Sequence, residues 1–177
     1  MSDARRQGRS FERKIPPGES RPRLVCTDCG FIYYENPKLV VGSVCEWSGR
    51  ILLCKRSIEP RSGFWTIPAG FMEQNETTEA GACREAWEEA RARIEIDALL
   101  AVYNIPHISQ VQLMYRARLK SPDVEAADET SEVGLFEWEE IPWGELAFPS
   151  VEWALKHHRE VRGQSSFAVF SKTHERD

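Results

Sequence analysis

Runs of apolar residues along the chain predict several strands and two helices. Apolar, β-rich stretches at 39–47 and 50–55 flank the pair Ser48-Gly49, a pattern typical of a tight hairpin. The stretch 77–91 contains no proline and few β-branched residues and predicts a helix, as does 150–161. Further strands are predicted at 94–105, 111–119, 133–138 and 166–170. Strands on both sides of a helix, with an antiparallel hairpin first, predict an α+β fold with a mixed sheet between helices.

The first 37 residues differ in pattern from the rest of the chain. Residues 1–23 are polar, basic and rich in proline and glycine, so we expect a loop-like arm there. Residues 24–37 carry the motif Cys26-x-x-Cys29 between two short β-rich runs, and they predict a small hairpin. The predicted organisation is therefore an arm over 1–23, a hairpin over 24–37 and a main domain over 38–177.

The composition is that of a soluble protein of ordinary size. The 177 residues are 41% hydrophobic and 29% charged with a net charge of −5, which fits one domain with a short accessory segment. No apolar run is long enough to cross a bilayer and the first residues carry no secretory signal, so we expect a cytoplasmic protein. The five cysteines are an odd set, which favours reduced thiols. The negative net charge gives no general attraction to nucleic acid.

One face of the predicted helix at 77–91 is acidic. At about 100° per residue the small and apolar positions fall in one arc, which we expect to face the core: Ala80, Cys83, Ala86, Trp87 and Ala90. Glu85, Glu88 and Glu89 fall together on the opposite side. Like charges at this spacing each cost roughly 0.2–0.5 kcal/mol, so stability alone does not favour them. They fit either a solvated acidic face, partly neutralised by Arg84 and Arg91, or a site for a hard divalent cation.

The residues around these glutamates favour the cation site. Gly70 is followed after five residues by Glu76, and after seven more by the run Arg-Glu-Ala-Trp-Glu-Glu at 84–89. This arrangement resembles the Nudix pattern G-x5-E-x7-R-E-U-x-E-E-x-G-U, where U is aliphatic, at six of its seven fixed positions. The departure is Arg91 at the place of the last glycine; a left-handed conformation costs an arginine roughly 1 kcal/mol, so we expect a rearranged helix end. The resemblance implies a Nudix fold, an α/β/α sandwich with a mixed sheet.

The Nudix resemblance also implies a metal-dependent pyrophosphatase. The implied ligands of Mg²⁺ or Mn²⁺ are Glu85 and Glu89 first, then Glu88, and a backbone carbonyl of Ala69 or Gly70. Glu76 and Arg84 would support these ligands, because a guanidinium can hold a carboxylate by a bidentate pair. The implied reaction is attack of a metal-activated water on a pyrophosphate phosphorus.

Two further sets of residues complete the expected site. The general base varies in position within this family, and Glu129 and Glu132 are our candidates, with solvated loop acids as the alternative interpretation. Aromatic and cationic side chains near the motif could bind the ring and the diphosphate of a nucleotide. The candidates for substrate binding are Arg56, Arg61, Trp65, Phe71 and Tyr103. Their alternative places are the core for the aromatic residues and exposed loops for the arginines.

The resemblance runs from Arg21 onward and points to the Nudix branch that carries an N-terminal zinc ribbon. It is carried by the segments 34–38, 52–56, 65–71 and 141–143. That branch has two Cys-x-x-Cys knuckles, and Cys26-x-x-Cys29 matches the second, while Ala4 and Gln7 stand where the first is expected. Because two thiolates alone make a weak site, we expect no structural zinc, only a partial site at this pair. A degenerate ribbon without metal and a different true start of the reading frame both explain the missing knuckle.

This branch implies hydrolysis of a nucleoside diphosphate linked to another moiety, with ADP-ribose or FAD as the expected substrate. The alternatives are NADH or nucleoside triphosphates and, as a different class, a nucleotide-sensing Nudix-like regulator of transcription. The residue array typical of NADH pyrophosphatases is absent, and the complete set of motif glutamates favours an enzyme over a regulator. We further expect a homodimer that binds neither nucleic acid nor membrane.

Overall fold

The N-terminal unit is a three-stranded antiparallel sheet. A computed structural model describes residues 10–175, and the chain divides into two compact units between Asn36 and Pro37. The first unit consists of β1 (Phe11–Lys14), β2 (Arg23–Cys26) and β3 (Ile32–Tyr33), paired in that order. β2 and β3 are the two short strands that the sequence predicted around the Cys-x-x-Cys motif.

Strand β1 lies where the sequence predicted a loop-like arm. All four residues of β1 pair with β2, so the prediction of a loop throughout 1–23 was wrong. Three of these four residues are exposed, which leaves no alternation of apolar and polar positions from which a strand could be predicted. Residues 1–9, with Ala4 and Gln7, lie outside the described residues.

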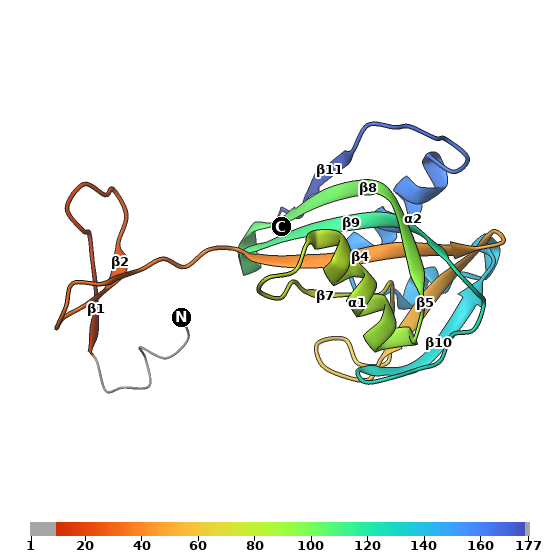
Figure 1. The fold of residues 1–177 in the computed structure, drawn as a ribbon, viewed down its shortest axis with the longest axis horizontal. Helices are drawn as coiled ribbons and strands as arrows, with labels where there is room; N and C mark the ends of the chain where they lie inside the picture. Colours follow the sequence, from red (N-terminus) through yellow and green to blue (C-terminus); the bar gives the residue numbers. More distant parts are fainter. Residues whose placement is uncertain (1–9, 176–177) are drawn as a thin grey trace. The chain divides into compact units, whose positions relative to one another are not determined.

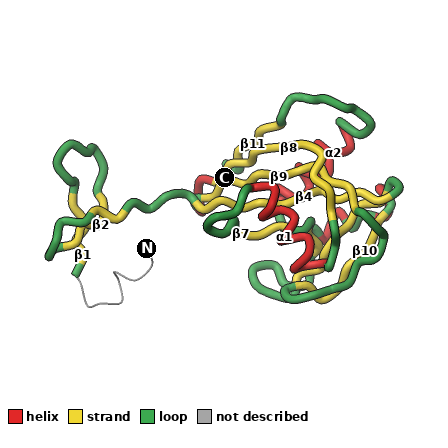
Figure 2. Tube along the Cα trace, viewed as in Figure 1, coloured by secondary structure: helices red, strands yellow, loops and turns green. Residues whose placement is uncertain are grey.

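The second unit is built on one mixed sheet, drawn in Figures 1 and 2. Its strands are β4 (Lys38–Trp47), β5 (Arg50–Arg56), β6 (Trp65–Thr66), β7 (Ala69–Phe71), β8 (Ile94–Ile105), β9 (Gln110–Leu119), β10 (Thr130–Phe136) and β11 (Phe170–Thr173). The order is β10-β5-β4-β9-β8-β11, with β6 paired to β5 and β7 to β4. The pairs β4–β9 and β8–β11 are parallel and the others antiparallel. The sheet is therefore mixed, as predicted.

Helices α1 (Thr78–Ala90) and α2 (Pro149–Glu160) cover opposite faces of this sheet (Figure 1). Successive side chains of a strand point to opposite faces, so Val40 and Val44 of β4 pack in the cluster that contains α2. Cys45 packs with Ala86 of α1 on the other face. Three short 3-10 turns complete the unit: η2 (Pro106–Ile108), η3 (Trp138–Glu140) and η4 (Trp143–Glu145). The predicted arrangement of a mixed sheet between helices is confirmed. No helix in residues 10–175 is long and apolar enough to span a membrane.

The first hairpin of this unit was predicted correctly from the sequence, but its last strand was misplaced. β4 and β5 pair around Ser48 and Gly49, whose φ angles of 47° and 90° are those that a tight two-residue turn requires. The last strand begins at Phe170, so the predicted strand at 166–170 was wrong except at its final residue. Phe167 packs against the core from a loop and not from a strand. The guanidinium carbon of Arg116 lies 4.6 Å from the centre of its ring.

Helix α1 faces the sheet with a different side from the one predicted. Its buried residues are Gly81, Ala82, Glu85, Ala86, Glu89 and Ala90. Ala86 and Ala90 are buried as predicted, but Ala80 is exposed and Trp87 is 42% exposed, so the buried face is rotated by roughly 100° from the predicted arc. Small residues allow the helix to approach β4 closely: a Cβ atom on Gly81 would lie 2.9 Å from Val41. Two glutamates of the motif are consequently carried to the protein side of the helix.

The end of α1 keeps the geometry that the motif glycine would give. Arg91 has φ 49° and ψ 22°, the left-handed conformation, and its backbone N–H caps the carbonyls of Ala86 and Trp87. Its guanidinium Nη1 also donates to Trp87 O at 3.2 Å, and Nη2 donates to Asp128 at 3.3 Å. These bonds partly offset the cost of the left-handed conformation, so the expected rearrangement of the helix end is not found.

Candidate active site

A cleft of about 810 Å³ runs along the second unit past the acidic turn of α1. Its lining includes Gly70 and Phe71 of β7 and the carboxylates of the acidic turn. Thr77 fixes the start of the helix, since its side-chain oxygen accepts the N–H of Ala80 at 3.1 Å. The helix then presents the glutamates to the cleft from two successive turns, as their spacing of three and four residues requires.

Arg84 links the acidic residues of the cleft to one another. Its Nε and Nη2 donate to the two carboxylate oxygens of Glu76 at 3.0 and 2.8 Å. Its Nη1 donates to Glu85 at 2.7 Å and to Glu88 at 2.8 Å, and Nη2 also donates to the carbonyl of Phe71 at 3.1 Å. The bidentate pair that we expected between Arg84 and a neighbouring carboxylate is present, and its partner is Glu76. The Arg84 guanidinium thereby connects Glu85 and Glu88 to Glu76, which lies in the loop after β7.

Glu76 is an anchor of this network. Besides Arg84 it accepts the backbone N–H of Glu73 at 2.6 Å. The Arg84 guanidinium, with this N–H, lowers the pKa of Glu76 to about 2. Glu76 is therefore ionised at any physiological pH and holds the guanidinium in place.

Gly70 lies directly over the carboxylate of Glu85. A Cβ atom at this position would lie 2.4 Å from Glu85 Oε2 and 2.5 Å from Oε1. Glycine is thus required by close approach and not by its φ angle. Glu85 is only 8% exposed, and its burial raises the pKa of its carboxyl group above the usual value.

Glu89 is the most strongly perturbed carboxylate of the cleft. It is 7% exposed, and burial, followed by the charge of Glu85, raises its pKa to about 8. Its compensating contact is weak, because the N–H of Ala69 donates to Oε2 at 3.4 Å. Glu85 is compensated by Arg84 Nη1 at 2.7 Å, but a buried carboxylate as weakly paired as Glu89 is costly for a folded chain.

Of the two candidate bases, Glu129 lies in the cleft. It stands close enough to Glu85 and Glu89 for its charge to raise the pKa of both. The carbonyl of Glu129 accepts the N–H of Ser57 at 2.8 Å, which ties its loop to the end of β5. Glu132 is not part of the cleft lining; its carboxylate accepts Lys55 Nζ at 3.3 Å on the surface.

The structure separates the predicted substrate-binding residues. Arg56 and Phe71 line the cleft. Arg61 is exposed outside the lining and stacks on the ring of its neighbour Phe64, 5.0 Å away. Trp65 and Tyr103 are buried in the core, and neither lines the cleft, so the structure does not support them as platforms for a nucleotide ring.

Four polar residues of the cleft lining were not predicted from the sequence. They come from η2, β9 and the residue after β11, namely His107, Gln110, Gln112 and His174. A signal was present in the sequence: polar Gln110 and Gln112 alternate with apolar residues on a strand that is otherwise mostly apolar. Polar side chains at every second position of a central strand indicate that the face they share is not entirely core.

The acidic donor set fits a hard divalent cation. Carboxylate oxygens of Glu85, Glu88 and Glu89 are the ligands that Mg²⁺ and Mn²⁺ prefer, and all three glutamates line the cleft. Within residues 10–175 no group of three acidic, histidine or cysteine side chains is already arranged around one metal position. Arg84 Nη1 bridges Glu85 and Glu88 instead, so the carboxylates would have to turn to bind a cation.

The cysteine pair of the first unit lies in a tight knuckle. Gly30, with φ 72°, donates its N–H to the carbonyl of Cys26 at 3.0 Å. Cys26 is buried and Cys29 is exposed. Backbone N–H groups of Cys29 and Asp28 lower the pKa of the Cys26 thiol. A third or fourth protein ligand beside this pair is not found in the described part of the chain.

Comparison with known proteins agrees with this fold and site. The family model for the NUDIX domain matches residues 37–160, and the Nudix N-terminal model, a zinc ribbon, matches residues 8–35. A crystal structure of a NUDIX hydrolase from Nitrosomonas europaea is 45% identical, covers 98% of both chains and has a TM-score of 0.89. The chain therefore belongs to the Nudix hydrolase family, whose members typically depend on a divalent metal ion and act on small nucleotides. Its N-terminal unit matches the N-terminal zinc-ribbon segment of this family.

Two further proteins are similar to this chain over part of their length. An ADP-ribose pyrophosphatase from Methanocaldococcus jannaschii is 30% identical over 65% of this chain and 69% of its own length. A MutT-like protein from Streptomyces ambofaciens is 38% identical over 45% of this chain, and the match spans about half (49%) of that protein. The first of these similarities agrees with a pyrophosphatase.

Proposed function

We propose that this protein hydrolyses the pyrophosphate bond of a nucleoside diphosphate linked to another moiety, with ADP-ribose or FAD as its substrate. The observation that carries the proposal is the acidic turn held by the Arg84–Glu76 pair beneath Gly70, in the lining of a large cleft. The cleft volume of about 810 Å³ lies within the range of about 300–1,000 Å³ typical of ligand sites. A dinucleotide-like substrate fits such a space better than a single phosphate does.

In this proposal the acidic turn binds the metal and the rest of the cleft positions the substrate. Glu85 and Glu89 would hold Mg²⁺ or Mn²⁺, with Glu88 completing the set once Arg84 releases it. The bound ion would neutralise charge on the phosphoryl oxygens and lower the pKa of a water molecule. Arg56 lines the same cleft and would pair with the diphosphate. Glu129 is the carboxylate placed to accept the proton of the attacking water.

The test is a hydrolysis screen of ADP-ribose, FAD, NADH and nucleoside triphosphates with Mg²⁺ and with Mn²⁺. Glu89→Gln should lower kcat/KM by about 100-fold or more, because it removes a charged ligand and nearly keeps the side-chain volume. Glu79→Gln is the matched control, since Glu79 is an exposed residue in the first turn of the same helix. If the purified wild type hydrolyses no substrate faster than Glu89→Gln, the proposed function is wrong. A preference for NADH or triphosphates would replace only the substrate.

A further inference from the structure

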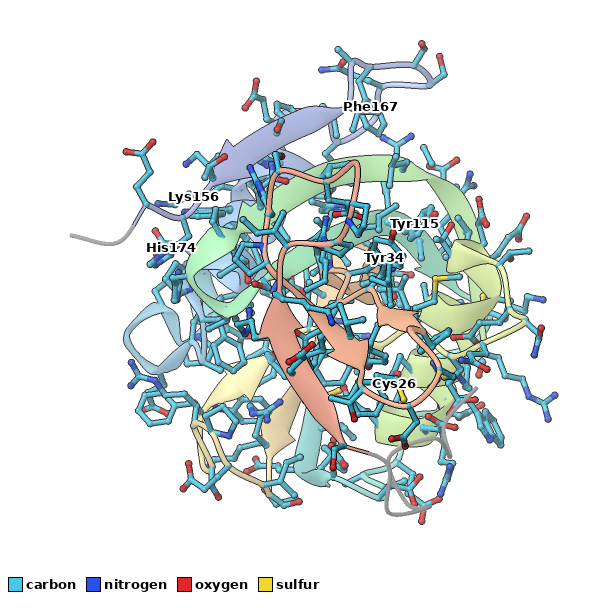
Figure 3. The ribbon with its side chains drawn as sticks, turned by 90° about the vertical axis from the view of Figure 1, so that its left-hand side faces the viewer. Cys26, Tyr34, Tyr115, Lys156, Phe167 and His174 are labelled. Atoms are coloured by element: carbon cyan, nitrogen blue, oxygen red, sulfur yellow. The ribbon has the colours of Figure 1, made fainter. Side chains whose placement is uncertain are left out.

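A second part of the cleft lining has the character of a recognition site. Gln110 and Gln112 project from β9 on the face that carries α2, the face shared by Met114 of the core. His174 follows β11 and lies near α2 (Figure 3), and its ring centre is 5.1 Å from that of His107. Polar and aromatic groups thus form one wall of the cleft.

Two polar atoms of this wall are left unpaired. Gln112 Oε1 and His174 Nδ1 are buried and have no hydrogen-bond partner among the described residues. The Gln112 Nε2 group donates to Gln110 Oε1 at 3.4 Å, so one amide proton and the whole carbonyl oxygen of Gln112 remain available. The neighbouring Tyr103 is different, because its hydroxyl pairs with His157 Nδ1 at 2.8 Å. Native proteins seldom leave such atoms unpaired without a functional reason.

We propose that this wall binds the nucleobase of the substrate and that Gln112 selects a purine that carries an amino group, as adenine does. This inference rests on the proposed function, because it takes the ligand to be a nucleoside diphosphate whose phosphates reach the acidic turn. With a turn of its side chain toward the cleft, Gln112 accepts the amino N–H at Oε1 and donates Nε2–H to the adjacent ring nitrogen. A turn that keeps the donation of Gln112 Nε2 to Gln110 Oε1 keeps the amide in this orientation, because the reverse orientation would set two acceptor oxygens against each other.

Hypoxanthine is the discriminating analogue. It has the size and stacking surface of adenine, but an oxygen replaces the amino group and the adjacent ring nitrogen carries a proton. Bound in the same orientation, it would place its oxygen against Gln112 Oε1, acceptor against acceptor. A bidentate amide pair discriminates between bases by about 5- to 150-fold, so we expect ADP-ribose to be preferred to IDP-ribose by a factor in that range.

The experiment measures kcat/KM for ADP-ribose and IDP-ribose with the wild type and two variants. Gln112→Met keeps the length of the side chain and removes both polar groups, and its adenine-to-hypoxanthine ratio should fall close to one. Gln164→Leu is the control, because Gln164 lies exposed outside the cleft lining, and it should keep the wild-type ratio. The melting temperature of Gln112→Met should not fall, since the amide oxygen that it removes is unpaired in the free protein.

Binding of AMP and IMP, followed by calorimetry, provides a readout that does not depend on hydrolysis. Tighter binding of AMP by the wild type, abolished in Gln112→Met, supports the inference. Equal affinities for AMP and IMP in the wild type, or an unchanged preference in Gln112→Met, overturn it. A wild type that hydrolyses no nucleoside diphosphate but still distinguishes AMP from IMP would disprove the proposed reaction while supporting the base site.

Discussion

Replacing Gly70 with alanine perturbs the acidic turn without touching a charged group. The added methyl carbon would lie 2.4–2.5 Å from the carboxylate atoms of Glu85, whereas ordinary contacts begin at 3.4 Å. The loop or the carboxylate must therefore move by about 1 Å, and a misplacement of that size can cost about 100-fold in rate. We expect kcat/KM for ADP-ribose to fall by about this factor in Gly70→Ala.

The same substitution should have a smaller effect on stability. The φ angle of Gly70 is not positive, so alanine fits the backbone and loses about 0.4–1 kcal/mol less conformational entropy on folding. Crowding of the site costs about 1–3 kcal/mol, and the net loss in the free energy of unfolding should stay near 2 kcal/mol or less. Gly144→Ala is the matched control, since nothing lies within 4 Å of its added carbon.

The assay compares the kinetics of both variants with their urea denaturation. A folded Gly70→Ala protein with kcat/KM within a few-fold of the wild type would refute the argument, because it would mean that the Glu85 carboxylate can shift without effect on the reaction. A similar loss of activity in Gly144→Ala would show that the loss has nothing to do with the acidic turn.

Three further predictions concern groups that the structure places around the site and on α2. Arg84→Lys cannot reproduce the fork that holds Glu76, so it should lower kcat/KM and reduce the free energy of unfolding by about 1–3 kcal/mol; unchanged urea denaturation would contradict this. Arg91→Gly should raise the free energy of unfolding by up to about 1 kcal/mol, since glycine adopts φ 49° without strain, and a loss measured in urea would show that the arginine contacts dominate. Burial lowers the pKa of His158 below 6.5 despite its bond to Glu46, so stability should fall as the pH drops through 6.5, and this slope should diminish in His158→Gln. An equal slope in both proteins between pH 7.5 and 5.5 would contradict the assignment.

The parts of the site that could be predicted from sequence are those fixed by local geometry. The spacing of Glu85, Glu88 and Glu89 on one helix determines that they share a side, whatever the helix packs against. A bidentate pair of Arg84 with a neighbouring carboxylate was also predicted, and in the structure that carboxylate is Glu76. The mixed sheet was equally accessible, because the hairpin and the helix limits are marked by turn and capping residues.

Assignments that depend on tertiary packing could not be made in this way. Trp65 and Tyr103 are aromatic residues near the motif in sequence or in the sheet, yet they pack in the core. This could not be predicted, because the neighbouring strands are apolar on both faces and give no sign of which face opens into a cleft. Gln112 was overlooked for the converse reason. Gln110 and Gln112 alternate with apolar residues at the start of β9, but the significance of Gln112 depends on the wall formed with residues from η2 and from the end of the chain.

The misplaced core face of α1 shows why polarity alone misleads at a functional site. A helical wheel assumes that glutamate faces water, but Glu85 and Glu89 share the buried side with Ala82 and Ala86. Burial raises the pKa of both carboxyl groups, and their hydrogen bonds come from Arg84 and from one long contact with a backbone N–H. A chain selected only for stability would not keep this arrangement. A cation bound between the two carboxylates would neutralise the repulsion that the fold leaves uncompensated, which is why the orientation of the helix favours a metal site more strongly than the spacing of its glutamates does.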